Sequence, residues 1–538
     1  MPRQRGARRP ASAAWRHVPH TSRVSAASLA RVPTRDRTLV QVWPADSQGA
    51  VEALAARDDV LREHPTQPES DGATVFEQAH GPFASYRRTV HTSATGEVVS
   101  TTAYRLDIPW FGWLFAGPIR RSLRHRRPAG ASSPWWAPPD QLTARQARTL
   151  ALLAVAAATA AFANTLFTQT ANAAATAFGI TDRGLGHAGA IVRIGVLIAL
   201  PFAFVADRIG RRRTIILLAW LTPLFCALGA ASPNFWVLTA SQTVARPLGI
   251  ALGLLAGVAA AEEMPRNSRA YALSVLAMSA GLGAGLAVAA LPLRDLGPDG
   301  WRLAYLLALV LLPVGYSLWR KLDETRRFAT VHQVAQRIDR RRLGLIIAVA
   351  ITSNLFVAPA SFFQNNYLED VRGYSGGATA LFTLATGTPA SLGLVLGGRL
   401  ADVVGRRRLI IMCTPVATAC LTLAFMVDGA AMWAATLVGG FTGALAHSAY
   451  AVYRAELFPT GNRGGANGLI TTCALFSGSL SILIVGTLRD QGWSFGAILG
   501  VAAVGQLAAA VIAYRWYPET AHVELEQLNP GDPAIADD

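Results

Sequence analysis

Apolar runs of about twenty residues dominate this chain after residue 147, and each is long enough to cross the hydrocarbon core of a bilayer. Because a backbone in lipid must satisfy its own hydrogen bonds, these runs should be α-helices. The predicted spans are 149–172, 187–206, 214–231, 235–260, 271–292, 301–319, 344–366, 377–400, 409–427, 431–455, 466–487 and 494–515. The sequence therefore predicts an all-α membrane protein with 12 transmembrane helices in two pseudo-symmetric bundles of six.

The division into two halves rests on phrases that occur twice. "VADRIGRRRT" occupies residues 205–214 and "LADVVGRRRL" occupies 400–409, so that Asp207 and Asp402 are 195 positions apart. A second phrase, which joins a glutamate to an arginine, recurs at an offset of 194 (Glu262 and Arg269; Glu456 and Arg463). Two independent phrases at nearly one spacing indicate duplicated halves.

The charge of the chain also suits a membrane protein. The formal net charge is +16, yet Lys321 is the only lysine, and most of the arginines after residue 147 stand beside the apolar spans. Positive charge beside a span fixes its orientation, so we expect no nucleic-acid partner. The arginine-rich loops fall on one side, which places both termini in the cytoplasm and the chain in the cell membrane.

The first 141 residues differ from the rest. Residues 1–40 have the composition of a disordered basic tail, and 84–108 alternate polar and apolar residues around a Thr-Gly break, as a β-hairpin does. Aromatic residues at 110–115 precede a basic run ending at Arg127, which suits either a segment on the inner membrane surface or the core of a small α+β domain. The expected divisions are 1–40 tail, 41–141 cytoplasmic extension, 142–319 first bundle, 320–342 connector, 343–517 second bundle and 518–538 tail.

The repeated phrases resemble those of the major facilitator superfamily, over about residues 142–525. The loop pattern Gly-x-x-x-Asp-Arg-x-Gly-Arg-Arg is matched in the first half by Asp207, Arg208, Gly210, Arg211 and Arg212, and in the second half by Gly398, Asp402, Gly405, Arg406 and Arg407. Ala203 and Val403 depart from it. The phrases at Glu262–Arg269 and Glu456–Arg463 resemble the sugar-porter and metabolite–proton symporter branch. The resemblance implies a secondary transporter that alternates between inward-open and outward-open states.

Charges at the cytoplasmic ends of the helices are predicted to control that motion. A carboxylate among arginines stays ionised and pairs, so contacts between the halves there would hold the inner face closed. We assign this gating role to the matched residues of both loops together with Glu262, Arg269, Glu456 and Arg463.

Two arginines within the spans are the main candidates for solute binding, because a charge inside a membrane span is costly and usually functional. Arg193 lies 14 residues from Asp207, and Arg246 lies 16 residues from Glu262. At about 1.5 Å per residue the two guanidinium groups sit at similar depth, where they suit a carboxylate-bearing solute. Either one could instead extend to the outer interface or cap carbonyl groups.

Polar residues elsewhere in the spans give weaker indications. The amides of Asn164, Gln169, Asn172, Asn354 and Gln364 could line a cavity or join helices. His447 could carry a proton or serve helix packing. The segment "ARPLGIALG" resembles the helix-4 arginine–glycine pattern of proton-coupled drug exporters, and this resemblance implies a role in proton relay for Arg246.

The function predicted from the sequence is secondary transport of a small organic solute, a metabolite for which an organic acid and a sugar are the candidates. A proton is the candidate coupling ion. Proton-coupled multidrug efflux is one alternative, and a membrane-anchored binding or regulatory protein acting through 41–127 is another. No nucleophile–base pair, ATP-binding loop or metal-ligand cluster is visible, so we expect no enzyme activity, cofactor or metal. The expected form is a monomer in the bilayer.

Overall fold

The computed structural model describes residues 36–66, 73–93, 95–127, 134, 136–199, 201–202, 209–265, 268–324, 339–458 and 463–520. Asp207 and Arg208 lie outside these ranges, as do residues 1–35 of the predicted tail. For some helical residues the description covers the backbone alone, among them Arg269, Gly398, Asp402, Glu456 and Arg463. The chain divides into two compact units, one with residues up to 107 and 118–129, the other with 108–117 and everything from 130 onward.

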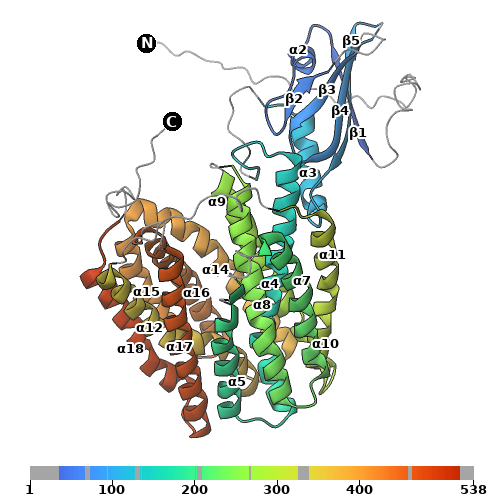
Figure 1. Cartoon of the computed structure of the whole chain (residues 1–538). Coiled ribbons are helices and arrows are strands. Elements are labelled where there is room, and N and C mark those ends of the chain that lie inside the picture. Colours follow the sequence, from blue (N-terminus) through green and yellow to red (C-terminus); the bar gives the residue numbers. More distant parts are fainter. Residues whose placement is uncertain are drawn as a thin grey trace, which may run out of the picture. The chain divides into compact units, whose positions relative to one another are not determined.

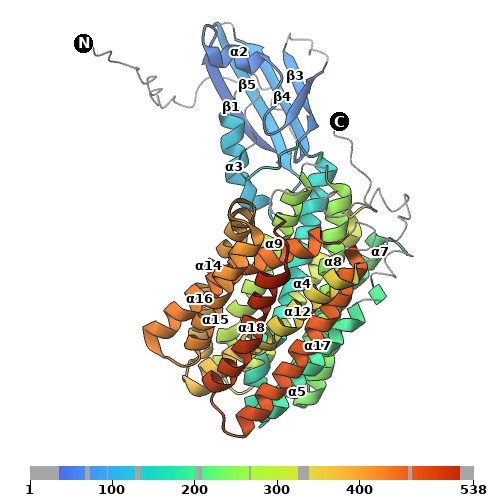
Figure 2. The same ribbon diagram turned by 90° about the vertical axis from the view of Figure 1, so that its left-hand side faces the viewer.

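The first unit is a five-stranded antiparallel sheet in the order β1-β5-β4-β3-β2 (Figure 1, Figure 2). Its strands are β1 (Arg37–Pro44), β2 (Arg62–Pro65), β3 (Thr74–His80), β4 (Phe83–Thr92) and β5 (Glu97–Leu106). Helix α2 (Gln48–Leu54) contributes Ala50 and Ala53 to a core with Phe76, Val90 and Val98. Strands β4 and β5 form the predicted β-hairpin, in which Val90 of β4 pairs with Ser100 of β5.

A buried ion pair joins the strands of this sheet. Glu63 on β2 and Arg88 on β4 meet at 2.6 Å, with side chains 0% and 4% exposed respectively. Tyr86 donates a hydrogen bond of 2.6 Å to the same carboxylate, and Arg88 also donates to the backbone oxygen of Ala53. Because both charges are out of water, each depends on the other for compensation.

The aromatic segment after the sheet forms helix α3 (Gly112–Arg124). Ile119 and Leu123 of this helix are buried, whereas the side chain of Trp113 is 77% exposed. Trp110 and Leu114 are exposed as well. Phe111 and Phe115 are partly buried, so both readings of this segment, on the membrane surface or in the core of a small domain, stay predictions.

The second unit is helical. Its first half contains α4 (Ala144–Ala177), α5 (Asp182–Ile194), η1 (Gly195–Ala199), α7 (Arg211–Leu228), η2 (Gly229–Ala231), α8 (Phe235–Glu263), α9 (Arg269–Ala289), η4 (Leu291–Leu296), α10 (Gly300–Leu306), η5 (Leu307–Leu311) and α11 (Leu312–Lys321). Its second half contains α12 (Arg340–Phe362), α13 (Gln364–Asn366), η7 (Tyr367–Val371), α14 (Gly376–Val404), α15 (Arg406–Ala424), α16 (Gly429–Glu456), α17 (Arg463–Asp490) and α18 (Phe495–Trp516).

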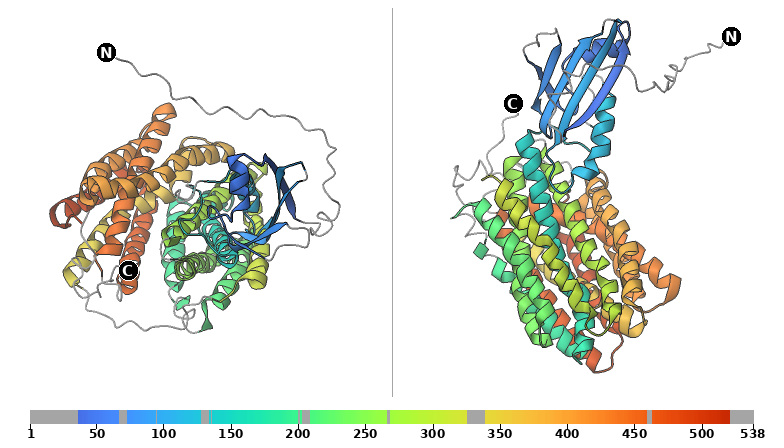
Figure 3. Two further views of the ribbon diagram at one scale, coloured as in Figure 1. Left: turned by 90° about the horizontal axis from the view of Figure 1, so that it is seen from above. Right: turned by 90° about the vertical axis from the view of Figure 1, so that its right-hand side faces the viewer.

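Ten helices of the described ranges are long and apolar enough to cross a membrane. They match ten of the predicted spans. The two remaining predictions, 187–206 and 377–400, correspond to α5 with η1 and to α14. The helices form two groups when viewed from above, one coloured from teal to green and the other from yellow to red (Figure 3).

Each half has its own apolar core, and a further cluster is shared. Leu152, Leu218 and Leu252 belong to the core of the first half, while Ile410 and Ile470 belong to that of the second. The shared cluster includes Leu185 on α5, Phe362 on α12 and Ile482 on α17. It lies away from the arginine-rich turns that precede α7 and α15, so the two halves are packed together at the opposite end of the helices.

The buried ion pair of the sheet generates a first prediction. Glu63→Ala would leave Arg88 buried without its carboxylate, a change that costs about 3–5 kcal/mol. We expect amide hydrogen exchange in β2–β5 of the full chain to accelerate accordingly. Glu97→Ala is the control, because Glu97 is exposed at the start of β5. Unaltered exchange in the Glu63 variant would show that this pair does not stabilise the sheet.

Candidate functional site

The repeated loops form the same backbone turn in both halves. Gly210 precedes α7 with φ of 102°, and Gly405 precedes α15 with φ of 103°. Residues other than glycine rarely adopt a φ in this range, which explains why glycine occupies both positions. The duplication seen in the sequence is therefore a duplicated turn in the structure.

A carboxylate from a distant part of the chain caps the helix that follows each turn. Glu324 accepts a hydrogen bond of 3.0 Å from the backbone N–H of Arg212. Glu519 accepts bonds of 2.9 and 3.2 Å from the backbone N–H groups of Arg406 and Arg407. The first N–H groups of a helix have no partner within it and carry partial positive charge, so an anion there is stabilising.

The arginine two positions after each glycine binds the end of another helix in the same half. Arg212 donates to the backbone oxygens of Leu322 and Trp319, at 2.6 and 2.9 Å. Arg407 donates to the backbone oxygen of Tyr514 on α18. A guanidinium group at these positions pairs with carbonyl groups that the helix leaves unbonded.

Our sequence reasoning did not identify Glu324 and Glu519 as site residues, although the sequence carries a signal for both. Each is the glutamate of a Glu-Thr pair, and the two are separated by the same 195 positions as Gly210 and Gly405. The backbone acceptors Trp319 and Tyr514 also differ by 195. A systematic comparison at that offset would have found them.

The other predicted gating residues are placed only in part. Arg211 pairs with Glu262 at 2.9 Å, which joins α7 to α8 within the first half. The side chains of Asp402, Glu456 and Arg463, and all of Asp207 and Arg208, lie outside what the structure describes. The contacts recorded at the two turns each join elements of one half, so the gating role of these residues stays a prediction.

The two span arginines lie near one another and near the second half. Arg193 on α5 donates a hydrogen bond of 2.8 Å to Oδ1 of Asn354 on α12. Its guanidinium group also lies against Gly478 of α17, where a Cβ atom would come within 2.8 Å of Nε. Arg246 on α8 is close enough to interact electrostatically with Arg193.

Both guanidinium groups retain unused hydrogen-bonding capacity. In each of them Nε is buried and has no hydrogen-bond partner among the described residues. Oδ1 of Asn164 on α4 is in the same condition. Asn164 lies beside Gly249, one helical turn from Arg246, where a Cβ atom would be 3.0 Å from this oxygen. Three polar groups of the first half, with Asn354 of the second, therefore form a candidate binding site.

The remaining predicted amides lie elsewhere. Gln169 accepts hydrogen bonds from Asn365, at 2.8 Å through its backbone oxygen and at 2.9 Å through Oε1. Asn172 donates to Glu369 at 2.6 Å. These contacts lie between α4 and the segment after α12, at the end opposite to the arginine-rich turns. The sequence could not separate these amides from Asn164, because polarity on a helix does not specify depth.

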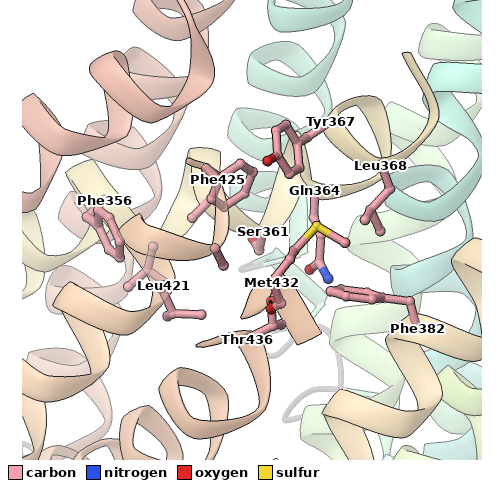
Figure 4. Close-up of a pocket in the computed structure, with 13 residues that line it drawn as sticks. Phe356, Ser361, Gln364, Tyr367, Leu368, Phe382, Leu421, Phe425, Met432 and Thr436 are labelled. Carbon is pink, nitrogen blue, oxygen red and sulfur yellow. Dashed lines mark hydrogen bonds between the residues drawn. The ribbon is translucent and has the colours of Figure 1, made fainter. Parts of the chain in front are cut away.

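Gln364 contributes to a cavity within the second half. The cavity has a volume of about 150 Å³. Its wall is mostly apolar and aromatic, with Ser361, Gln364 and Thr436 among the polar side chains (Figure 4). All of the lining residues come from the second half, and neither the two span arginines nor their neighbours Asn164 and Asn354 are among them. His447 is exposed on α16, and its role stays a prediction.

The chain matches the family model described as Major Facilitator Superfamily over residues 152–388 and 344–533. The cis,cis-muconate transport protein of Acinetobacter baylyi is 26% identical over 364 residues, which cover 61% of this chain and 84% of that protein. The citrate-proton symporter of Klebsiella pneumoniae is 27% identical over 40% of this chain and 52% of that one. Among solved structures, the xylose transporter XylE from E. coli matches with a TM-score of 0.59 at 15% identity, over 71% of this chain and 98% of that chain.

The repeated turn generates a second prediction. Gly405→Ala would force an unfavourable backbone conformation and place a Cβ atom 2.8 Å from the Glu519 carboxylate. We expect a loss of stability of about 1–3 kcal/mol, seen as a lower melting temperature of the purified protein. Gly210→Ala should behave alike. Gly344→Ala is the control, because it adds the same atom to a helix with open space around it. Equal melting temperatures for all three variants would contradict the proposed strain.

Proposed function

The chain belongs to the major facilitator superfamily, and on that basis we propose that it carries a carboxylate-bearing organic solute bound between Arg193 and Arg246. It is a multi-pass membrane protein and a transporter of a small organic solute by family. The proposal adds the chemical class of the solute and the residues that bind it.

The observation that carries this proposal is a pair of neighbouring, partly buried guanidinium groups that each have a donor without a partner among the described residues. Two like charges close together in a poorly solvated place repel one another. Among the residues that the structure describes, Nε of Arg193 and Nε of Arg246 are buried without a partner, and Arg193 donates a hydrogen bond to an amide oxygen through another of its nitrogens. A solute carboxylate would neutralise the pair and accept their hydrogen bonds in the forked geometry that guanidinium groups favour.

The hydrogen bond between Arg193 and Asn354 suggests how solute binding is linked to movement. Arg193 belongs to the first half and Asn354 to the second, so this bond crosses between them. A carboxylate that binds Arg193 competes with Asn354 and changes a contact between the halves. Rocking of two halves about a central site is the expected motion of a transporter built from repeats.

The names of two relatives support a solute that carries carboxylate groups. Muconate and citrate, after which they are named, are both polycarboxylate ions. The second relative is named as a proton symporter, which supports a proton as the coupling ion of this chain. Arg246 and His447 remain the candidate residues for proton coupling.

We further propose that the arginine-rich turns face the cytoplasm. Arg211, Arg212 and Arg213 precede one span, and Arg406, Arg407 and Arg408 precede its counterpart. Clusters of this kind are retained on the cytoplasmic side. The end at which α4 meets Glu369 is then the outer end, and the predicted gating residues form the inner one.

Charge-removing substitutions test the binding site. Arg193→Ala and Arg246→Ala should each weaken binding of a transported dicarboxylate at least tenfold, because a hydrogen bond to a charged group contributes about 1.5–3 kcal/mol. The measurement is calorimetric titration of purified protein with a dicarboxylate identified by thermal-shift screening.

Arg320→Ala is the matched control, since Arg320 is an exposed arginine at the end of α11. It should bind the solute as the unmodified protein does. Comparable affinity in the Arg193 and Arg246 variants would exclude these residues from the site. Preference for the methyl ester over the free acid would exclude a carboxylate solute.

A further inference from the structure

The two halves of the helical unit are joined at the proposed outer end by a group of polar side chains, which we call the Glu369 cluster. Glu369 on η7 pairs with Arg294 on η4 and accepts a hydrogen bond from Asn172 on α4. Asn366 on α13 donates to Asp182 on α5 at 3.1 Å and to Asp370 at 2.6 Å. Asp182 also pairs with Arg489 on α17 at 3.5 Å. Acidic, arginine and amide groups thus connect three elements of the first half (α4, α5 and η4) with three of the second (α13, η7 and α17).

Close backbone packing accompanies this cluster. Gly186 of α5 faces Gly486 of α17, and a Cβ atom on Gly486 would lie 2.6 Å from the backbone oxygen of Asp182. The backbone N–H of Arg183 donates to Asp490 at 3.1 Å. With no space for a side chain between these helices, the halves are in direct contact and the structure has its proposed outer end closed.

Glu369 is the most enclosed carboxylate of the cluster. Its side chain is 5% exposed. The charged groups that act on it directly are Arg294 on η4 and Asp370 on η7. One step further out, Asp295 lies beside Arg294, Arg489 on α17 acts on both Asp370 and Asp182, and Asp490 acts on Asp182. Asn172 faces Glu369 from α4. Burial and the neighbouring Asp370 disfavour a negative charge on Glu369, whereas Arg294 favours one.

We propose that Glu369 is a proton-binding site of the outer end, which takes up a proton as the two halves close over it. Acidification of the outer solution then favours the closed outer end. This inference rests on the proposed transporter function and orientation, and it adds a site for protons that is separate from Arg246 and His447.

The direction of the effect follows from the environment of the carboxyl group. Burial raises the pKa of Glu369 to about 7, against the opposing effects of Arg294 and Asn172. Once the outer end opens to water, the pKa of this group returns toward the usual value of about 4.3. A group whose pKa is higher in the closed state stabilises that state at low pH. This stabilisation is complete below the lower pKa and is lost as the pH rises through about 7.

Neighbouring groups allow Glu369 to become neutral without leaving Arg294 uncompensated. Arg294 also approaches Asp295 at 3.8 Å. Asp295 in turn accepts bonds of 2.8 and 3.0 Å from the backbone N–H groups of Gly376 and Gly377, at the start of α14. This contact also crosses between the halves, so it keeps the outer end joined when the Glu369 charge is removed.

The test measures opening of the outer end directly. Spin labels are placed on Leu296→Cys and Gln491→Cys, two exposed positions of opposite halves, in a variant whose four native cysteines are replaced by serine. The distance between labels is measured in lipid nanodiscs at about pH 5.5 and about pH 8.5. We expect the ratio of closed to open molecules to be roughly tenfold or more higher at the lower pH.

Substitutions then assign the effect to one group. Glu369→Gln, which imitates the protonated carboxyl, should remain closed at both pH values, whereas Asp299→Asn should respond to pH as the unmodified protein does. Asp299 is an exposed acidic residue beside Arg302, outside the cluster. Arg294→Gln should move the midpoint to higher pH, because it removes a cation that favours the ionised carboxylate.

An unchanged ratio across this pH range, or a Glu369→Gln protein that still responds to pH, would overturn the proposal. Loss of the response in Asp370→Asn alone would assign the proton to Asp370 and also overturn it. Solute binding is measured separately on the same samples. A protein that responds to pH but binds no carboxylate would refute the proposed solute and leave the proton site intact.

Discussion

A membrane-spanning helix needs partners for the N–H and C=O groups at its two ends, and this need organises the arginine-rich side of the protein. Glu324 and Glu519 supply acceptors to the starts of α7 and α15. Arg212 donates to the end of α11, and Arg407 donates to the end of α18. Each turn therefore ties a helix start to a helix end, with all of its recorded contacts inside one half.

The two halves share this architecture but not the residues of the candidate binding site. The offset that relates Gly210 to Gly405 relates Arg193 to Thr388, so the second half carries no arginine at the matching position. Both span arginines belong to the first half, and the second contributes Asn354. Repetition thus explains the scaffold and the turns, whereas the candidate binding site is the place where the repeats differ.

Much of the fold followed from local patterns. The spans followed from the length of apolar runs, and the β4–β5 hairpin followed from alternation around a turn. Such patterns act over neighbouring residues, which the sequence displays. Contacts such as Arg193 with Asn354 or Asn172 with Glu369 join residues more than 150 positions apart. These contacts depend on how each helix is rotated about its axis and on how deep each residue lies in the membrane. An isolated polar residue in an apolar run specifies neither. For this reason the sequence analysis assigned Asn172 and Gln169 to the same predicted cavity as Asn164.

The amide of Asn354 has a consequence for an unloaded carrier. It gives Arg193 a neutral acceptor when no solute is present, so the vacant molecule is not left with an entirely unsolvated cation. Under the proposed function, an anionic solute that accepts from this same nitrogen would replace the bond to Asn354, and its net gain in binding free energy would be smaller by the free energy of that bond.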